Sequence, residues 1–250
     1  MITVSQVSKH FSGGTVALDT VDLTVAQGEF VSLLGPSGCG KSTLLRLLAG
    51  LDTASSGIVT VGGLAPIEAC RRGAIGVAFQ RPALVPSRTA LENIQLTLEI
   101  VHRPGSFAPE ELLRQFGLAA FRNHYPHQLS GGMQLRVNIA CALVHRPEIL
   151  LLDEPFGALD EMTRESLTGW LRSVLAETGQ TVVLVTHSVE EAVTLSHRIV
   201  LMRPHPGRVQ SIVTVPAAAR TGDWTNPAVV SEVTSLRRQL HAALPAETVA

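Results

Sequence analysis

Hydrophobic and polar positions divide this 250-residue chain into short aliphatic runs and longer amphipathic segments. In the first third, runs rich in valine and isoleucine alternate with glycine, which is typical of strands. We expect strands over ITVSQVS (2–8), ALDTVDLTV (17–25), EFVSLLG (29–35), GIVTVGG (57–63) and GAIGVAF (73–79). The segment KSTLLRLLAGL (41–51) instead has helical spacing, so a strand, a glycine-rich loop and a helix follow one another.

Farther along, the pattern becomes helical and then returns to strands. Residues 148–154 and 181–187 are nearly continuous aliphatic runs, which is typical of strands buried on both faces of a parallel sheet. Ser188 followed by Glu191 predicts a capping box on a further helix. The other expected elements are helices over 89–101, 109–117, 133–144, 161–177 and the amphipathic stretch 231–244, and strands over 198–202 and 207–215.

These elements predict one α/β domain with a helical insertion. Its expected parts are a core formed by residues 1–88 and 146–215, a helical subdomain over 89–145, and a tail over 216–250 that contains a helix. We expect this tail to be too short for a second regulatory domain.

Composition narrows the class of protein. A hydrophobic content of 45% supports a full core, and a net charge of −1 argues against a general nucleic-acid surface. Cys39, Cys70 and Cys141 lie far apart without CxxC spacing, which argues against a disulfide framework or a zinc knuckle. Because no run reaches the roughly 18 apolar residues of a membrane span, we expect a soluble chain that meets a membrane through a partner.

The most specific motif is GPSGCGKST, which lies between an expected strand and helix. Gly35, Gly40, Lys41 and Ser42 satisfy G-x-x-x-x-G-K-[ST], in which backbone amides and a helix N-terminus cradle a polyphosphate. The chain has two lysines and eighteen arginines, and a lysine here suits a compact ammonium that reaches between phosphates. The alternative is an ordinary glycine-rich turn. The expected phosphate-binding residues are Gly35, Pro36, Ser37, Gly38, Cys39, Gly40, Lys41, Ser42 and Thr43.

Two adjacent carboxylates, Asp153 and Glu154, close the expected strand in ILLLDEP. Burying them there is costly unless a cation meets them. We predict that Asp153 and Ser42 hold Mg²⁺, and that Glu154 orients and deprotonates a water that attacks the γ-phosphate of ATP. The alternative is an acidic pair that faces solvent.

The segment YPHQLSGGMQ (125–134) contains a serine and two glycines directly before an expected helix. This arrangement forms a second anion cradle, although an ordinary capped helix start has the same residues. Leu129-Ser130-Gly131-Gly132 resembles the signature motif of ATP-binding-cassette (ABC) ATPases. The resemblance implies a head-to-tail homodimer in which Lys41 of one chain and Ser130 and Gly132 of the other contact the same ATP.

Four further residues are similar to functional residues of that family, and the matching segments span residues 3 to about 215. The resemblance implies that Gln80 contacts the metal or water and that Phe11 stacks on adenine. It also implies that Asp160, in FGALD, lies at the dimer interface, and that His187 contacts the γ-phosphate, although a lone histidine at a strand end is often structural. The fold it implies is a RecA-like P-loop NTPase core with an N-terminal antiparallel β subdomain and an inserted α-helical subdomain.

Within the family, the segments QRPALVPSRTALENI and DEPFGALD are similar to importer ATPases for nitrate, alkanesulfonates or taurine. Such a subunit couples hydrolysis of ATP, with Mg²⁺, to uptake of a small anion. Its implied partners are transmembrane permease subunits, whose coupling helix would contact Arg81–Asn93, and indirectly an extracytoplasmic solute-binding protein. We expect a peripheral location on the cytoplasmic face of the inner membrane. Leu135, Asn138 and Cys141 depart from the residues usual on the signature helix.

The main alternative is an ABC-type ATPase coupled to DNA or to the ribosome. The DNA-repair type inserts a long coiled coil between the residues that correspond to Gln80 and Ser130, whereas 49 residues without sustained heptads separate them here. The translation-factor type carries two cassettes in a chain, and this chain has one. A non-catalytic binding module would not need Glu154 and His187. We therefore expect no nucleic-acid partner.

Overall fold

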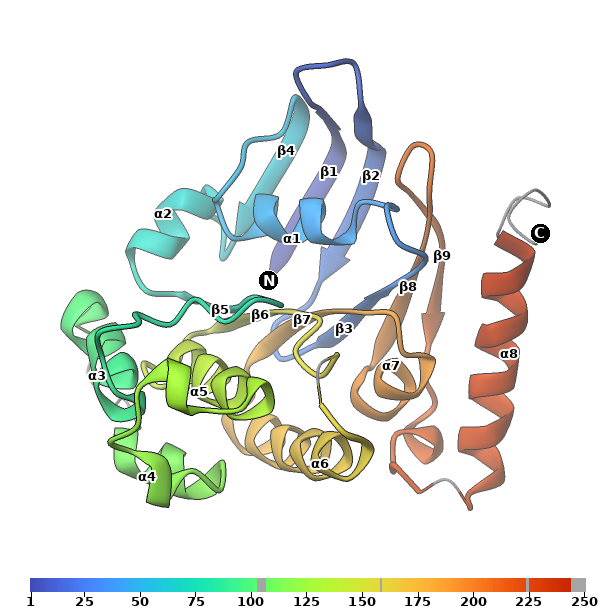
Figure 1. Cartoon of the computed structure of the whole chain (residues 1–250). Coiled ribbons are helices and arrows are strands. Elements are labelled where there is room, and N and C mark those ends of the chain that lie inside the picture. The colour runs from blue at the N-terminus through green and yellow to red at the C-terminus, as the bar shows by residue number, and fades with distance from the viewer. Residues whose placement is uncertain (103–106, 158, 224, 244–250) are drawn as a thin grey trace. The chain divides into compact units, whose positions relative to one another are not determined.

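The computed structural model describes residues 1–102, 107–157, 159–223 and 225–243, which form two compact units (Figure 1). The first unit combines Met1–Pro66 with the chain from Thr181 onward, and the second consists of Ile67–Gln180. Each unit is described by itself below.

The first unit contains two groups of strands. β1 (Ile2–His10) lies between β2 (Val16–Val25) and β4 (Ser56–Val61) and is antiparallel to both. In the second group, β3 (Phe30–Leu34) lies parallel between β7 (Thr181–Thr186) and β8 (Arg198–Arg203), and β9 (Arg208–Thr214) is antiparallel to β8. Every residue of β7 is buried, as its nearly continuous aliphatic sequence predicts. Every residue of β3 is buried as well.

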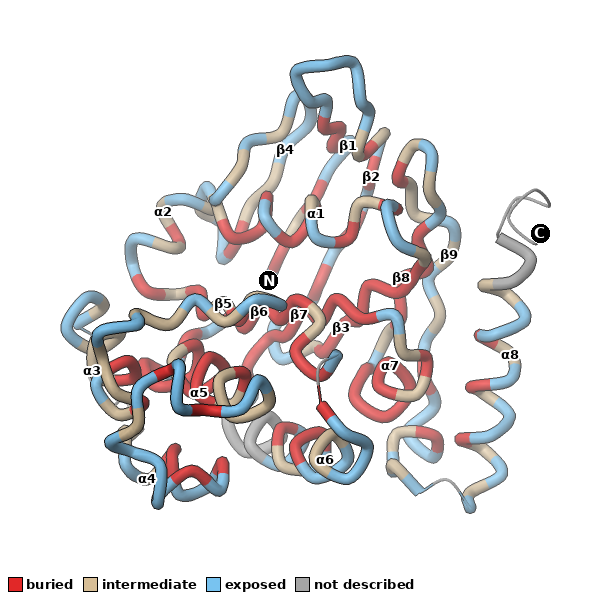
Figure 2. The backbone as a smooth tube through the Cα atoms, viewed as in Figure 1, coloured by how far each residue is buried: buried red, intermediate tan, exposed pale blue. Residues whose placement is uncertain are grey.

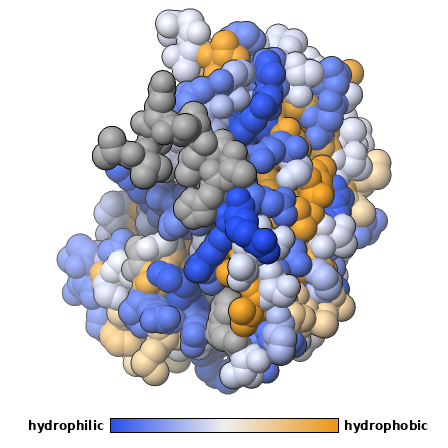
Figure 3. All heavy atoms as spheres, turned by 90° about the vertical axis from the view of Figure 1, so that its right-hand side faces the viewer, coloured by the Kyte–Doolittle hydropathy of each residue, from blue (hydrophilic) through white to orange (hydrophobic). Residues whose placement is uncertain are grey.

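Helices of the first unit pack on this second group of strands. α1 (Lys41–Leu48) follows β3, and α7 (Val189–Leu195) follows β7. A short 3₁₀ helix, η3 (Ala217–Ala219), precedes the long α8 (Pro227–Ala243), which packs along α7 (Figure 1). Buried positions fill α7 and recur along one side of α8 (Figure 2). On the side of the molecule shown in Figure 3, hydrophilic residues surround smaller hydrophobic areas.

The second unit contains one parallel strand pair and most of the helices. β5 (Ile75–Ala78) pairs with β6 (Ile149–Asp153), and α5 (Gly131–Leu143) packs against β5 and against α3 (Ala90–Val101). Thr89 starts α3 with a complete capping box, because its hydroxyl accepts from Glu92 and the Glu92 carboxylate accepts from the Thr89 N–H. The remaining elements are α2 (Pro66–Arg71), α4 (Pro109–Gln115), η1 (Ala119–Phe121), η2 (Pro126–Gln128) and α6 (Glu161–Thr178).

The predicted α/β class, with an antiparallel N-terminal sheet and an inserted helical part, is confirmed. One α-helix was not predicted, and two helices begin earlier than expected. α2 was not predicted, because six residues are too few to show a helical period. α5 begins at Gly131 rather than Met133, and α8 begins at Pro227 rather than Ser231. Leu244, at the end of the expected amphipathic stretch, lies outside the described residues. The proposed division into core, helical subdomain and tail stays a prediction.

Candidate functional site

The loop between β3 and α1, in the first unit, carries the predicted phosphate-binding residues. Gly40 directly precedes α1 with φ +88°, and a Cβ atom there would lie 2.5 Å from Leu18 Cδ2. Both the backbone angle and the space therefore require glycine at this position. The loop and the start of α1 combine buried Gly35, Cys39 and Lys41, half-buried Pro36, Gly40 and Thr43, and exposed Ser37, Gly38 and Ser42.

Lys41, the first residue of α1, is buried and holds the loop from inside. Its Nζ donates to the carbonyl oxygens of Gly35, at 2.7 Å, and Pro36, at 3.0 Å. The Sγ atom of Cys39 lies 3.6 Å from the same Nζ. Burial raises the pKa of the Cys39 thiol, although the neighbouring Lys41 acts in the opposite direction, so the thiol is neutral at pH 7. The ammonium thus lies among the backbone groups that a phosphate-binding loop uses.

Phe11 and His187 also belong to the first unit. Phe11 follows β1, with its N–H donating to Thr15 O at 2.9 Å, and its side chain is 43% exposed. An exposed aromatic ring of this kind can offer a face to a planar base. His187 follows β7 and is exposed.

Ser188 caps α7, as the sequence predicts, but the capping box is only half formed. The Ser188 Oγ accepts from the Glu191 N–H at 3.1 Å. The Glu191 carboxylate, however, accepts from the Thr186 hydroxyl at 2.5 Å. The Ser188 N–H donates to the same Thr186 hydroxyl oxygen at 3.0 Å, so a threonine at the strand end replaces the glutamate in the box.

The predicted catalytic carboxylates lie in the second unit, at the end of β6. Asp153 is the last residue of the strand and is 8% exposed, whereas Glu154 is half-buried. Glu154 has φ +47°, in the left-handed region that residues other than glycine rarely adopt. Gln80 Nε2 donates to Glu154 Oε2 at 2.9 Å, so two predicted site residues meet. Local backbone strain of this kind is concentrated at functional sites.

The signature residues form the start of α5. Ser130 is the N-cap, and its Oγ accepts from the Met133 N–H at 3.3 Å while its O–H stays available as a donor. Gly131 and Gly132 are the first helical residues, where backbone N–H groups have no acceptor within the helix. Ser130 and Gly131 are exposed and Gly132 is half-buried. The chemistry of this helix start therefore suits a phosphate.

Asp160 directly precedes α6 and is exposed. Its Oδ1 accepts from the Thr163 N–H at 3.0 Å, which is an N-cap contact. Hydrogen bonds from Thr163 lower the pKa of Asp160, so the carboxylate is charged at neutral pH. Phe156, at the start of the FGALD segment, is buried, and Ala158 lies outside the described residues.

Two buried polar residues, Asn138 and Lys9, were not predicted as functional candidates. Asn138, which stood out only as a departure, is 4% exposed, and its Nδ2 donates to the carbonyl oxygen of Phe79, directly before Gln80, at 3.0 Å. A polar residue among apolar ones on a helix was the available signal. Lys9 is the other lysine of the chain, and it is buried. The two remaining departures are packing residues: Leu135 is buried, and burial raises the pKa of Cys141 to about 12.

Comparison with known proteins gives a consistent picture. The family model described as "ABC transporter" matches residues 18–157. An uncharacterized ABC transporter ATP-binding protein of Methanocaldococcus jannaschii is 46% identical over 211 residues, which cover 82% of this chain and 78% of that protein. A taurine import ATP-binding protein of Rhizobium johnstonii is 41% identical over 255 residues (98% and 96%). A sulfate/thiosulfate import ATP-binding protein of Mycobacterium tuberculosis is 44% identical, over 84% of this chain and 60% of that protein.

Solved structures agree with these relatives. A dimeric ATP-binding cassette in a post-hydrolysis state, bound to ADP and Pi, has a TM-score of 0.79 and 36% identity, over 87% of this chain and all of that one. Among the described helices, none has the length and apolar character that crossing a bilayer requires. The family match covers more than half of the chain, and it agrees with the phosphate loop and the signature helix. The chain therefore belongs to the ABC transporter family and is an ATP-binding subunit with ABC-type ATPase activity.

Proposed function

We propose that the chain is the ATPase subunit of an importer for a small anion such as taurine, another alkanesulfonate or nitrate, and that it works as a head-to-tail homodimer. The observation that carries this proposal is the phosphate loop, in which Lys41 donates to Gly35 O and Pro36 O. The relatives support the choice of substrate class: the taurine import protein of Rhizobium johnstonii aligns with 98% of this chain.

We assign the roles within one ATP site as follows. Lys41 and the amides of its loop bind the β- and γ-phosphates. Ser42, Gln80 and Asp153 offer hydroxyl, amide and carboxylate oxygens, the hard donors that suit Mg²⁺, which would offset the negative charge of the phosphates. Glu154 accepts the proton of the attacking water, and the amide of Gln80 holds that carboxylate in place.

A second group of residues acts across the dimer. We assign Ser130 and Gly132 to the γ-phosphate of the ATP held by the other copy, and Asp160 to the contact between copies. His187 contacts the γ-phosphate from the same copy as Lys41. The capped, glycine-rich start of α5 supports this assignment, and the similar cassette bound to ADP and Pi is itself dimeric.

We further propose that permease subunits dock on Arg81–Asn93 from the cytoplasmic face of the membrane, with a solute-binding protein on the opposite side. Asn93 supports a preformed surface there, because it is 4% exposed and its side chain bridges the loop. Its Oδ1 accepts from the Val85 N–H at 2.7 Å, and its Nδ2 donates to Arg88 O at 2.9 Å. Retention of a multispanning membrane protein on the purified subunit would support this docking, whereas DNA-stimulated turnover would contradict it.

The variant Glu154→Gln tests the function. It keeps the size of the side chain but removes the base, so turnover should fall by about 10²–10⁴-fold while ATP still binds. With ATP and Mg²⁺ it should accumulate as a dimer in size-exclusion chromatography with light scattering. Glu110→Gln, at an exposed position of α4, is the matched control and should hydrolyse normally. A Glu154→Gln protein that stays monomeric and hydrolyses ATP at the normal rate would refute the proposal.

A further inference from the structure

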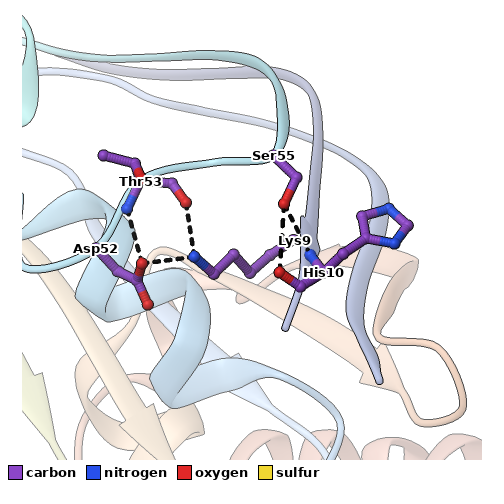
Figure 4. A network of polar contacts seen from close by, with 5 residues as sticks. All are labelled: Lys9, His10, Asp52, Thr53 and Ser55. Atoms are coloured by element: carbon purple, nitrogen blue, oxygen red, sulfur yellow. Dashed lines mark hydrogen bonds and ion pairs between the residues drawn. The ribbon is translucent and has the colours of Figure 1, made fainter. Parts of the chain in front are cut away.

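Lys9, the second lysine, has a network of its own near the end of β1 (Figure 4). The residue is 9% exposed. Its Nζ lies 2.5 Å from Asp52 Oδ1 and donates to Thr53 O at 2.9 Å. The same Nζ lies 5.1 Å from the centroid of the Phe11 ring. One compact ammonium thus meets a carboxylate, a carbonyl and an aromatic face.

Neighbouring hydrogen bonds fix both sides of this contact (Figure 4). The N–H of His10 donates to Ser55 Oγ at 2.9 Å, and the N–H of Ser55 donates to Ser8 O at 2.8 Å. The hydrogen bond from Lys9 lowers the pKa of Asp52, so the ion pair persists at neutral pH. The segment that follows α1 is therefore tied to the end of β1, and Phe11 comes two residues after Lys9.

We propose that Lys9 is a positioning residue for adenine recognition: it holds the Phe11 ring at a fixed place relative to the segment that follows the phosphate-binding helix. An exposed phenylalanine would otherwise lose rotamer freedom when a base stacks on it. The ammonium attracts the ring face and removes part of that freedom in advance, which strengthens binding. The 43% exposure of Phe11 leaves ring surface for the base. This inference rests on the proposed role of Phe11 within the ATP site.

The test separates the adenine from the phosphates. Lys9→Met keeps most of the stem and removes the charge. By isothermal titration calorimetry, it should raise the Kd for ADP by about threefold to tenfold and leave the Kd for inorganic tripolyphosphate unchanged. In a Phe11→Ala background the same exchange should have less than about a twofold effect, because the ring that it positions is missing.

Two more variants make the result specific. Asp52→Asn keeps Lys9 but weakens its anchor, and should shift the Kd for ADP in the same direction even if Lys9→Met folds poorly. Arg198→Met breaks another partly buried ion pair of the first unit, to Glu29 at 3.0 Å, and should leave the ratio of the two Kd values unchanged.

Equal weakening of ADP and tripolyphosphate, or effects of Lys9→Met and Phe11→Ala that simply add, would overturn the positioning role and leave Lys9 a structural residue. A Phe11→Ala protein that binds ADP as tightly as the unmodified chain would overturn it too. An unmodified chain that binds neither compound would contradict the proposed function itself.

Discussion

The ammonium of Lys41 is held by two backbone carbonyls of the loop that it serves, in a position that is 7% exposed. Its three donors radiate from one small nitrogen, whereas the guanidinium of arginine is wider and donates from a rigid plane. The sequence uses arginine at nearly every other basic position, so we expect that the space around residue 41, more than its charge, favours lysine.

Lys41→Arg should therefore lower ATP turnover on the order of a hundredfold although the positive charge is kept. The reason is that the larger, planar head should not fit the buried position between Gly35 O and Pro36 O and still reach the phosphates. Steady-state hydrolysis assays measure the effect, and Arg46→Lys, at an exposed position of α1, is the matched control. Near-normal turnover of Lys41→Arg would show that charge alone suffices.

Residues with local motifs could be predicted, and residues with distant partners could not. Ser130 was identifiable as the start of a helix because its cap contact reaches only three residues ahead. Lys9 bonds to Asp52, 43 residues away, and Asn138 bonds to Phe79, 59 residues away. Such contacts depend on how strands and helices come together, which a single sequence does not reveal.

Among the elements, α8 contributes side chains to the hydrophobic core of the first unit. Val229, Val233 and Leu236 belong to a buried cluster that also includes Val189 and Val193 of α7. An ion pair between Arg237 of α8 and Glu190 of α7 also joins the two helices. Since α7 directly follows His187 and Ser188, the tail helix supports the backbone that carries the proposed γ-phosphate contact.

Leu236→Ala should destabilise the protein by about 2–4 kcal/mol, because Leu236 is fully buried and its truncation leaves a cavity. Val230→Ala, on the same helix but 50% exposed, should change stability by less than about 0.5 kcal/mol. Urea titration followed by circular dichroism measures both. Equal effects of the two exchanges would mean that α8 is not part of the core.

Helices and strands with a strong hydrophobic pattern were predictable from the sequence, and those with a weak pattern were not. β6 and β7 are nearly continuous aliphatic runs and lie where expected. The first turn of α8 was missed because its start is set by Pro227 and by Asn226, whose Oδ1 accepts from the Ala228 N–H at 2.9 Å. Neither residue contributes to a hydrophobic period.

For the molecule as a whole, the protonation of His197 affects the stability of the folded state, because this residue joins the starts of β3 and β8. Its Nδ1 accepts from the Phe30 N–H at 2.9 Å, which requires that nitrogen to be unprotonated. Partial burial and the nearby Arg220 lower the pKa of His197, although Glu29 acts in the opposite direction. The folded state therefore prefers the neutral ring.

Below an unfolded-state pKa of about 6.5, the unfolded chain binds a proton at His197 that the folded chain does not yet bind. The free energy of unfolding therefore receives the full contribution of His197 above that pH and loses it as the pH falls. His197→Asn keeps an acceptor without a charge, so its free energy of unfolding should fall less between pH 7 and pH 5. Urea titrations at both pH values, with His127→Asn as an exposed control, measure the difference. Identical losses in all three proteins would exclude the contribution.

Gly76 has one further consequence. A Cβ atom on this residue of β5 would lie 2.1 Å from the carbonyl oxygen of Ala142, so the backbone of α5 rests on the strand with no side chain between them. Asn138 adds a hydrogen bond from the same helix to the residue before Gln80. We therefore expect a displacement of the start of α5, at Ser130, to move β5 and Gln80 together with the helix.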